Sequence, residues 1–204
     1  MAKTKNRWQE AEAHLAAADP TIGPLIEKYG PCRLAPHTDY FAVLCESIVS
    51  QQLAVKAADA IHGRFTAYYG GPPAPAAVLA TPPADLRALG LSGKKAEYIV
   101  DLAANFAGGA VTPGRFPALA DEEIIDQLVS VKGVGVWTAH MFLIFALNRP
   151  DVLPVGDFGV RKAMMLTYGL EALPDKATME SIAAAWRPWR SVASWYLWRS
   201  LENK

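Results

Sequence analysis

Apolar residues recur at helical spacing along most of the chain, and few segments alternate as β-strands do. The pattern therefore predicts an all-α protein. Proline-rich stretches at 72–83 and 112–117 are predicted to be linkers between helical layers. The segments expected to be helical are residues 5–18, 21–29, 39–69 (which allows a break), 82–89, 92–107, 121–130, 136–147, 157–169, 178–187 and 189–201.

The 204 residues are 51% hydrophobic, which is enough for one good core or two small subdomains. We expect residues 1–204 to form a single unit of two helical lobes. One lobe would span about 39–150, and the other would combine the N-terminus with about 151–204. No signal-peptide core and no run of about 18 apolar residues is present. The expected location is the cytoplasm, associated with the nucleoid if the protein is bacterial, without membrane contact.

A tight turn between two helices is predicted in VKGVGVWTAHMF, where Gly133 and Gly135 flank one valine. Glycine takes the positive φ values and close approaches that such a turn requires. A mostly apolar helix follows from Val136, and its first amides suit a phosphate oxygen. The turn therefore predicts contact with a nucleic-acid backbone.

The segment DVLPVGD then leads to Asp157, where a helix over 158–168 is expected to begin. One interpretation is a helix N-cap, because Asp accepts hydrogen bonds from the first helical amides. A second interpretation is catalytic, because a fixed carboxylate stabilises the positive charge that develops on a sugar when its bond to a base breaks. The two roles are compatible.

These two motifs, together with WRPWRSVASWYLW near the C-terminus and IVSQQLAVKAA at 48–58, resemble the helix-hairpin-helix DNA glycosylases. Within that superfamily they are similar to the alkylation-repair branch, the 3-methyladenine DNA glycosylase II type, over about residues 39–198. The resemblance implies a helix-hairpin-helix motif and a cleft between the lobes that binds DNA and the base. It also implies a monomeric N-glycosyl hydrolase of base excision repair, with no obligate protein partner and with Asp157 as the catalytic residue. Such an enzyme flips and excises alkylated bases, such as 3-methyladenine and 7-methylguanine, from double-stranded DNA.

The residue two places after Gly135 indicates the reaction subtype. In relatives that also cut the strand, the resemblance implies a lysine nucleophile there. This chain carries Trp137 at that place. We therefore predict a monofunctional enzyme that leaves an abasic site, and we expect Lys132 to contact a phosphate instead.

By the family pattern, Trp137 and Trp198 line the base pocket. An indole face attracts a flat cation, and alkylation at a ring nitrogen gives the base a positive charge. Met141 stands where the family often has an aromatic residue, so the pocket shape is expected to differ. For any one tryptophan, ordinary core packing is the alternative interpretation.

A flipped base leaves a gap in the stack, which a side chain usually fills. The resemblance implies Gln52 for this role, or Gln51 if the register is one residue off. The alternative is a polar pair on an exposed helix end. The formal net charge is zero, so any DNA-binding face must be local. The residues predicted to contact DNA are Gln51, Gln52, Lys94, Lys95, Lys132, Gly133, Gly135, Val136 and Thr138, and for any of the lysines a solvated surface charge is the alternative.

No cofactor is expected. Cys32 and Cys45 are the two cysteines, too few for the four ligands of an iron–sulfur cluster or for a zinc site without histidine help. The four histidines show no metal-ligand spacing with them. By family analogy, backbone carbonyls near Gly133 and Gly135 are candidates to hold a monovalent cation.

Two departures from the family pattern bear on the substrate. About 38 residues precede the resemblance, too few for the N-terminal mixed α/β domain of the bacterial prototype, and Gly156 replaces a second acid beside the catalytic one. A more open pocket with one charge fewer leads to the hypothesis that 1-methyladenine or 3-methylcytosine is also excised.

Two other functions remain as alternatives. The first is a glycosylase of the same fold for oxidised or mismatched bases, against which Trp137 and the tryptophan-lined pocket argue. The second is a helix-hairpin-helix DNA-binding module without catalysis. Such a module has no need of an acid at Asp157 or of an aromatic pocket.

Overall fold

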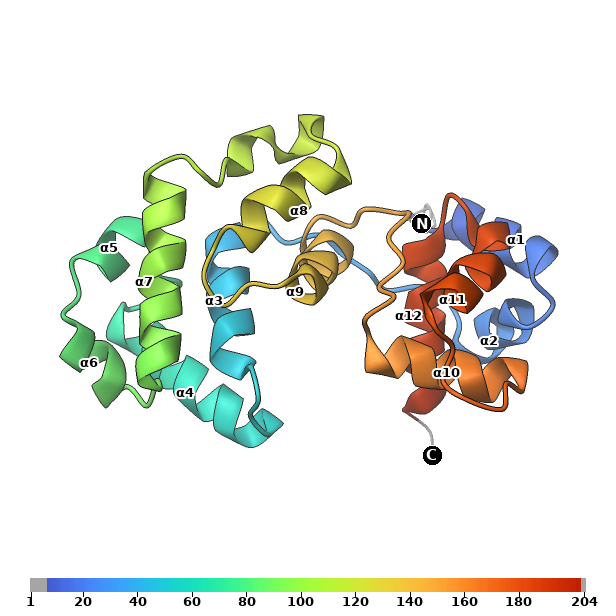
Figure 1. The fold of residues 1–204 in the computed structure, drawn as a ribbon, viewed down its shortest axis with the longest axis horizontal. Helices are drawn as coiled ribbons and strands as arrows, with labels where there is room; N and C mark the ends of the chain where they lie inside the picture. The colour runs from blue at the N-terminus through green and yellow to red at the C-terminus, as the bar shows by residue number, and fades with distance from the viewer. Residues whose placement is uncertain (1–6, 203–204) are drawn as a thin grey trace, which may run out of the picture. The chain divides into compact units, whose positions relative to one another are not determined.

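The computed structural model describes residues 7–202, and every regular element in this range is a helix (Figure 1). The all-α class predicted from the sequence is confirmed. The chain divides into two compact units, with unit 2 comprising His37–Phe142 and unit 1 comprising the residues before and after it. None of the described helices is long and apolar enough to cross a membrane.

Unit 2 is built around α7, which packs against α3, α5 and α6, while α8 packs against α9. Its core contains large apolar side chains from several helices, among them Ile48, Phe65 and Ile99, all fully buried. The elements of this unit are α3 (Tyr40–Ser50), α4 (Val55–Tyr68), α5 (Pro75–Leu79), α6 (Pro83–Ala88), α7 (Gly93–Ala107), the 3₁₀ helix η1 (Pro113–Ala118), α8 (Asp121–Val129) and α9 (Val136–Met141).

Unit 1 is built around α12, which packs against α1, α2, α10 and the 3₁₀ helix η3. This helix is buried on several sides, with Val192, Ala193, Tyr196 and Leu197 in the core. The elements are α1 (Gln9–Ala18), α2 (Ile22–Tyr29), α10 (Phe158–Tyr168), α11 (Lys176–Ile182), η3 (Ala183–Trp186) and α12 (Arg190–Leu201).

The interpretation of the proline-rich stretches as linkers was wrong in part, because each contains a short helix. Pro75 is the first residue of α5, and Pro113 is the first residue of η1. Proline suits the first helical position, where its missing N–H has no intrahelical acceptor to lose. The break allowed in 39–69 falls between Ser50 and Val55.

The helix expected over 136–147 is α-helical as far as Met141 and continues as a π-helical turn, η2 (Phe142–Ala146). Asn148 ends it with a left-handed φ of 53°, and its side-chain amide donates to the Ile144 carbonyl at 3.0 Å. Asparagine is among the few residues that adopt this conformation readily. A π turn advances the chain by an extra residue, which changes the direction in which Phe145 projects.

A buried carboxylate links the N-terminal and C-terminal segments of unit 1 by hydrogen bonds. Asp19, which follows α1, accepts hydrogen bonds from the Tyr168 hydroxyl and the Trp186 indole, both at 2.6 Å. Its other oxygen accepts from the amides of Thr21 and Ile22. Burial alone raises the pKa of Asp19, but these four hydrogen bonds outweigh it, so the pKa lies below its ordinary value.

We expect Asp19→Asn to lower the free energy of unfolding by about 2–3 kcal/mol, because the charge-assisted hydrogen bonds weaken in a buried site. Because the folded pKa of Asp19 is lowered, its stabilisation is present above the unfolded pKa of about 3.9 and is lost as pH falls through the folded pKa. Urea unfolding at neutral pH and at successively lower pH measures this, with the difference between the proteins shrinking as the solution becomes acidic. Glu180→Gln, which removes an exposed pair with Lys176, is the control and should change stability by less than about 0.5 kcal/mol.

Candidate functional site

Unit 2 has a cavity of about 680 Å³ between the end of α3, the start of α7 and the glycine turn that precedes α9. Most of the lining residues carry polar side chains, which include three serine hydroxyls, two glutamine amides and two lysine ammonium groups. The residues that line it are Ser47, Ser50, Gln51, Gln52, Ser92, Lys94, Lys95, Tyr98, Gly133, Trp137 and Thr138. Seven of these belong to the set predicted from the sequence, and Ser47, Ser50, Ser92 and Tyr98 do not.

The glycine turn is fixed by close contacts. Gly133 has a φ of 79°, and a Cβ at this place would lie 2.1 Å from Cδ2 of Tyr98. The Gly133 carbonyl accepts a hydrogen bond of 2.8 Å from the side-chain amide of Gln51. The turn therefore requires glycine at position 133 for both conformation and space, as the sequence predicted. One lone pair of that carbonyl is used by Gln51, and the monovalent cation stays a prediction.

Lys95 has a structural role that the sequence did not indicate. Its ammonium donates to the carbonyls of Val49 and Gln51, each at 2.7 Å, and so satisfies the end of α3. Burial lowers the pKa of Lys95. These two bonds use two of the three N–H groups of the ammonium. Lys94, next to it on the cavity wall, is exposed.

Lys132 lies in the turn but does not line the cavity. Its ammonium is 3.6 Å from the Asp101 carboxylate, and its backbone amide donates to the same carboxylate at 2.9 Å. The ammonium is well exposed. Phosphate contact by this lysine would compete with an exposed ion pair, which is a weak interaction.

The two glutamines differ in their surroundings. Gln51 is half-buried and bonded to the turn, whereas Gln52 is exposed and has a left-handed φ of 55°. A non-glycine residue held in this region is uncommon and costs conformational energy. Gln52 thus lies exposed and strained in the connection between α3 and α4.

The first turn of α9 is more exposed than its apolar sequence predicts. Val136 is exposed, and Trp137 is 47% exposed while forming part of the cavity wall. Thr138 is buried against the cavity, and Gly135 is the residue before the helix. Met141, at the end of α9, is half-buried and is not among the residues that line the cavity.

Unit 1 holds the predicted acid. Asp157 is the N-cap of α10, as the sequence predicted, and its Oδ1 accepts from the Val160 amide at 2.7 Å. The same oxygen accepts from Nε1 of Trp198 at 2.9 Å. The side chain is 7% exposed. The carboxylate is thus held by the N-terminus of α10 and by an indole from α12. A negative charge fixed in this way can stabilise a developing cation.

Three further residues, which were not predicted from the sequence, lie next to this acid in the chain or pack on Trp198. Phe145 of the π turn lies 5.3 Å from Trp198 between ring centroids, with their planes at 33°. A Cβ at Gly159 would lie 3.0 Å from Oδ1 of Asp157 and 3.1 Å from the Trp198 ring, so the indole packs directly on backbone. Phe158, directly after the acid, is 63% exposed. Of these residues, only Phe158 could have been identified from the sequence, because an apolar residue at the first position of a helix is expected to be exposed.

The cysteines have ordinary structural surroundings. Burial raises the pKa of Cys32 to about 12, and burial likewise raises the pKa of Cys45. A thiol with a raised pKa is a poor nucleophile near neutral pH. Among residues 7–202, no three His, Cys, Asp or Glu side chains are arranged to hold a metal ion.

The family model described as the HhH-GPD superfamily of base excision DNA repair proteins matches residues 45–190, a span that includes the glycine turn and Asp157. The chain belongs to this superfamily. The family recognised from the separated sequence motifs is therefore confirmed.

Relatives within the superfamily cover nearly the whole chain. DNA-3-methyladenine glycosylase 1 of Schizosaccharomyces pombe is 33% identical over 94% of this chain and 86% of its own length. Two solved structures are also similar. A DNA-3-methyladenine glycosidase from Bacillus halodurans is 33% identical with a TM-score of 0.86, covering 96% of this chain and 91% of that one. The 3-methyladenine DNA glycosylase of S. pombe in complex with abasic DNA is 31% identical with a TM-score of 0.83, covering 94% of this chain and 96% of that one.

Proposed function

We propose that this protein is a monomeric, monofunctional DNA N-glycosylase that removes alkylated bases from double-stranded DNA and leaves an abasic site. The observation that carries the proposal is the Asp157 carboxylate, fixed at the N-terminus of α10 and hydrogen-bonded by the Trp198 indole. The names of the relatives, 3-methyladenine DNA glycosylases, support the same reaction and the same substrate class.

In this reaction the bond between C1′ of the sugar and the ring nitrogen of the base breaks, and its electron pair leaves with the base. Positive charge develops on the sugar, and the Asp157 carboxylate stabilises it. Water then adds at C1′ and loses a proton. An alkylated base carries a positive charge and leaves as a neutral molecule, so the reaction requires little general acid catalysis.

Trp137 supports the monofunctional subtype. It occupies the place where strand-cutting relatives are expected to carry a nucleophilic amine, and an indole forms no Schiff base. Its exposed ring forms part of the wall of the unit 2 cavity. We propose that this ring stacks on the positively charged base, as an electron-rich face does on a flat cation.

We propose that the cavity wall of unit 2 contacts the DNA backbone. The exposed ammonium of Lys94, the hydroxyls of the lining serines and the amides of the glycine turn are all suitable phosphate donors. With a formal net charge of zero, affinity rests on these few groups, so it is expected to fall with salt less steeply than the affinity of a strongly basic DNA-binding protein.

We propose that Gln52 fills the stack that the flipped base vacates, since it is exposed while Gln51 is bonded to Gly133. Gln52→Ala is expected to lower the rate of base release about tenfold or more. Alanine is too short to fill the gap that the flipped base leaves in the DNA stack, so the flipped state is less stable. Fluorescence of 2-aminopurine beside the lesion measures flipping directly and should fall in parallel. Gln51→Ala serves as the comparison, and a larger flipping defect in that variant would assign the role to Gln51.

The test of the function is release of free bases from methylated duplex DNA, followed by alkali. We expect 3-methyladenine and 7-methylguanine in solution, and strands that break only after alkali treatment. Duplexes with a single 1-methyladenine or 3-methylcytosine test the wider substrate range. Strand cleavage without alkali would contradict the monofunctional subtype, and DNA binding without release of any base would favour a binding module.

A further inference from the structure

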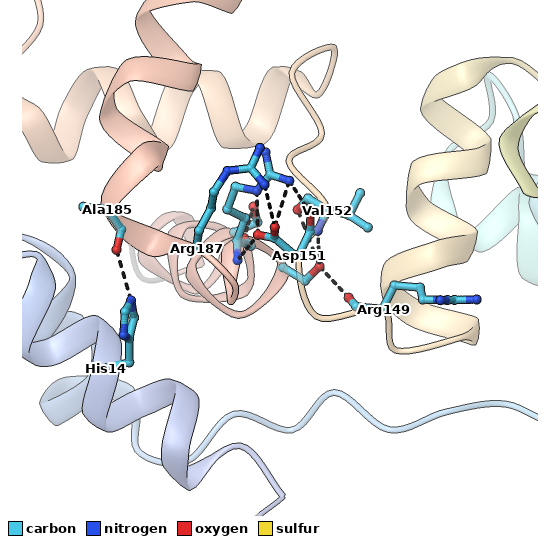
Figure 2. A network of polar contacts seen from close by, with 9 residues as sticks. His14, Arg149, Asp151, Val152, Ala185 and Arg187 are labelled. Carbon is cyan, nitrogen blue, oxygen red and sulfur yellow. Dashed lines mark hydrogen bonds and ion pairs between the residues drawn. The ribbon is translucent and has the colours of Figure 1, made fainter. Parts of the chain in front are cut away.

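The loop that ends at Asp157 is bound along its first half to the start of α12 (Figure 2). Ser191, which is fully buried, makes hydrogen bonds to three residues of this loop. Its amide donates to the Pro150 carbonyl at 3.0 Å, and its hydroxyl donates to the Arg149 carbonyl at 2.6 Å. The same hydroxyl accepts from the Val152 amide at 3.0 Å. One serine thus satisfies backbone groups of residues 149, 150 and 152.

An ion pair strengthens this attachment. Nε of Arg190 donates to Oδ1 of Asp151 at 2.6 Å, and Nη2 donates to the Asp151 carbonyl at 2.6 Å. Arg187 donates to the other carboxylate oxygen at 2.9 Å, and Figure 2 shows its guanidinium turned toward Asp151. The side chains of Arg190 and Asp151 are only 17% and 23% exposed, so solvent and salt screen this pair less than a surface pair.

The far end of the same loop is also held by α12, through Trp198 and Asp157. Ser191 and Trp198 are seven residues apart, which places them on nearly the same face of the helix, two turns and about 10 Å apart. One rigid helix therefore fixes both the start of the loop and the carboxylate at its end.

We propose that Arg190 and Ser191 are positioning residues, through which α12 sets the place of the Asp157 carboxylate by holding residues 149–152. The role rests on the proposed function, because it acts through the proposed catalytic acid. Loosening the start of the loop leaves Trp198 as the contact from α12 to the acid, and a displacement of about 1 Å in a catalytic group costs about a hundredfold in rate.

The variants that test this are Arg190→Gln, Arg190→Lys and Ser191→Ala, studied in the full chain at a temperature where each is folded. The first readout is the single-turnover rate of base release, set beside the dissociation constant for duplex DNA with an abasic-site analogue. We expect Arg190→Gln and Ser191→Ala to lower the rate about 10- to 100-fold with the dissociation constant within about twofold. Arg190→Lys keeps the charge and should recover part of the rate.

The second readout does not depend on activity. The indole N–H resonance of Trp198, assigned by its absence in Trp198→Phe, reports the hydrogen bond to Asp157. We expect this resonance to shift in Arg190→Gln and in Ser191→Ala. If the wild type releases no base, the proposed function fails, while a shift of this resonance still tests the positioning role.

Tyr168→Phe is the matched control, because it removes a partly buried hydrogen bond of the same unit, to Asp19, without changing a residue of the loop. It should lower the thermal midpoint while leaving the single-turnover rate and the Trp198 resonance unchanged. The proposal is overturned if both loop variants retain rates within twofold of the wild type, if the Trp198 resonance does not move, or if Tyr168→Phe lowers the rate as much as they do.

Discussion

Asp157→Asn is expected to lower the single-turnover rate of base release by a factor of about 100–1000, with little change in DNA affinity or thermal stability. The amide keeps an oxygen that accepts from the Val160 amide and the Trp198 indole, so the cap of α10 remains. The negative charge that stabilises the sugar cation is lost. Quench-flow or manual sampling with enzyme in excess measures the rate, and fluorescence anisotropy measures the affinity.

Asp175→Asn provides the matched control. Asp175 is the N-cap of α11, and its Oδ1 accepts from the Thr178 amide at 2.8 Å, so the two aspartates have the same local role. The same substitution there should leave the rate unchanged. If Asp157→Asn kept more than a tenth of the wild-type rate, the carboxylate would be a helix cap and not the source of catalysis.

The local features of the site could be predicted from the sequence because short-range physics determines them. The helix that begins at Phe158 and the N-cap Asp157 follow from an acid placed before a helical pattern. The positive φ of Gly133 follows from two glycines in a turn between helices. The resemblance placed Trp137 in the base pocket; the residue lies on the wall of the unit 2 cavity, and its contact with the base stays a prediction.

What could not be predicted depends on residues distant in the sequence. The indole of Trp198 meets Asp157 across 41 positions, and nothing in either segment specifies a hydrogen bond between them. Lys95 was expected to contact DNA, yet its ammonium satisfies the end of α3 through the carbonyls of Val49 and Gln51. The π turn that brings Phe145 against Trp198 also leaves no sequence pattern, because its apolar residues fit an α-helix equally well.

Gly133→Ala is expected to lower the free energy of unfolding by about 2–4 kcal/mol and DNA affinity by more than tenfold. The methyl group would lie 2.1 Å from the Tyr98 ring, and alanine is strained at a φ of 79°. Relief requires the turn to move, which displaces its amides and the carbonyl that binds Gln51. Urea unfolding measures the first effect, and a salt titration of binding to abasic-analogue DNA measures the second.

Gly135→Ala separates this strain from a general effect of adding a methyl group to the turn. The backbone of Gly135 is extended, with a φ of −101°, and a Cβ there meets no described atom within 4 Å. The free energy of unfolding of the Gly135→Ala variant should differ from that of the wild type by less than about 0.5 kcal/mol. In a Tyr98→Ala background the steric part of the Gly133→Ala cost disappears and the conformational part remains, so the loss of stability should be about half as large. An equal loss in both backgrounds would mean that conformation alone, and not the packing of Tyr98 on the turn, requires glycine at this position.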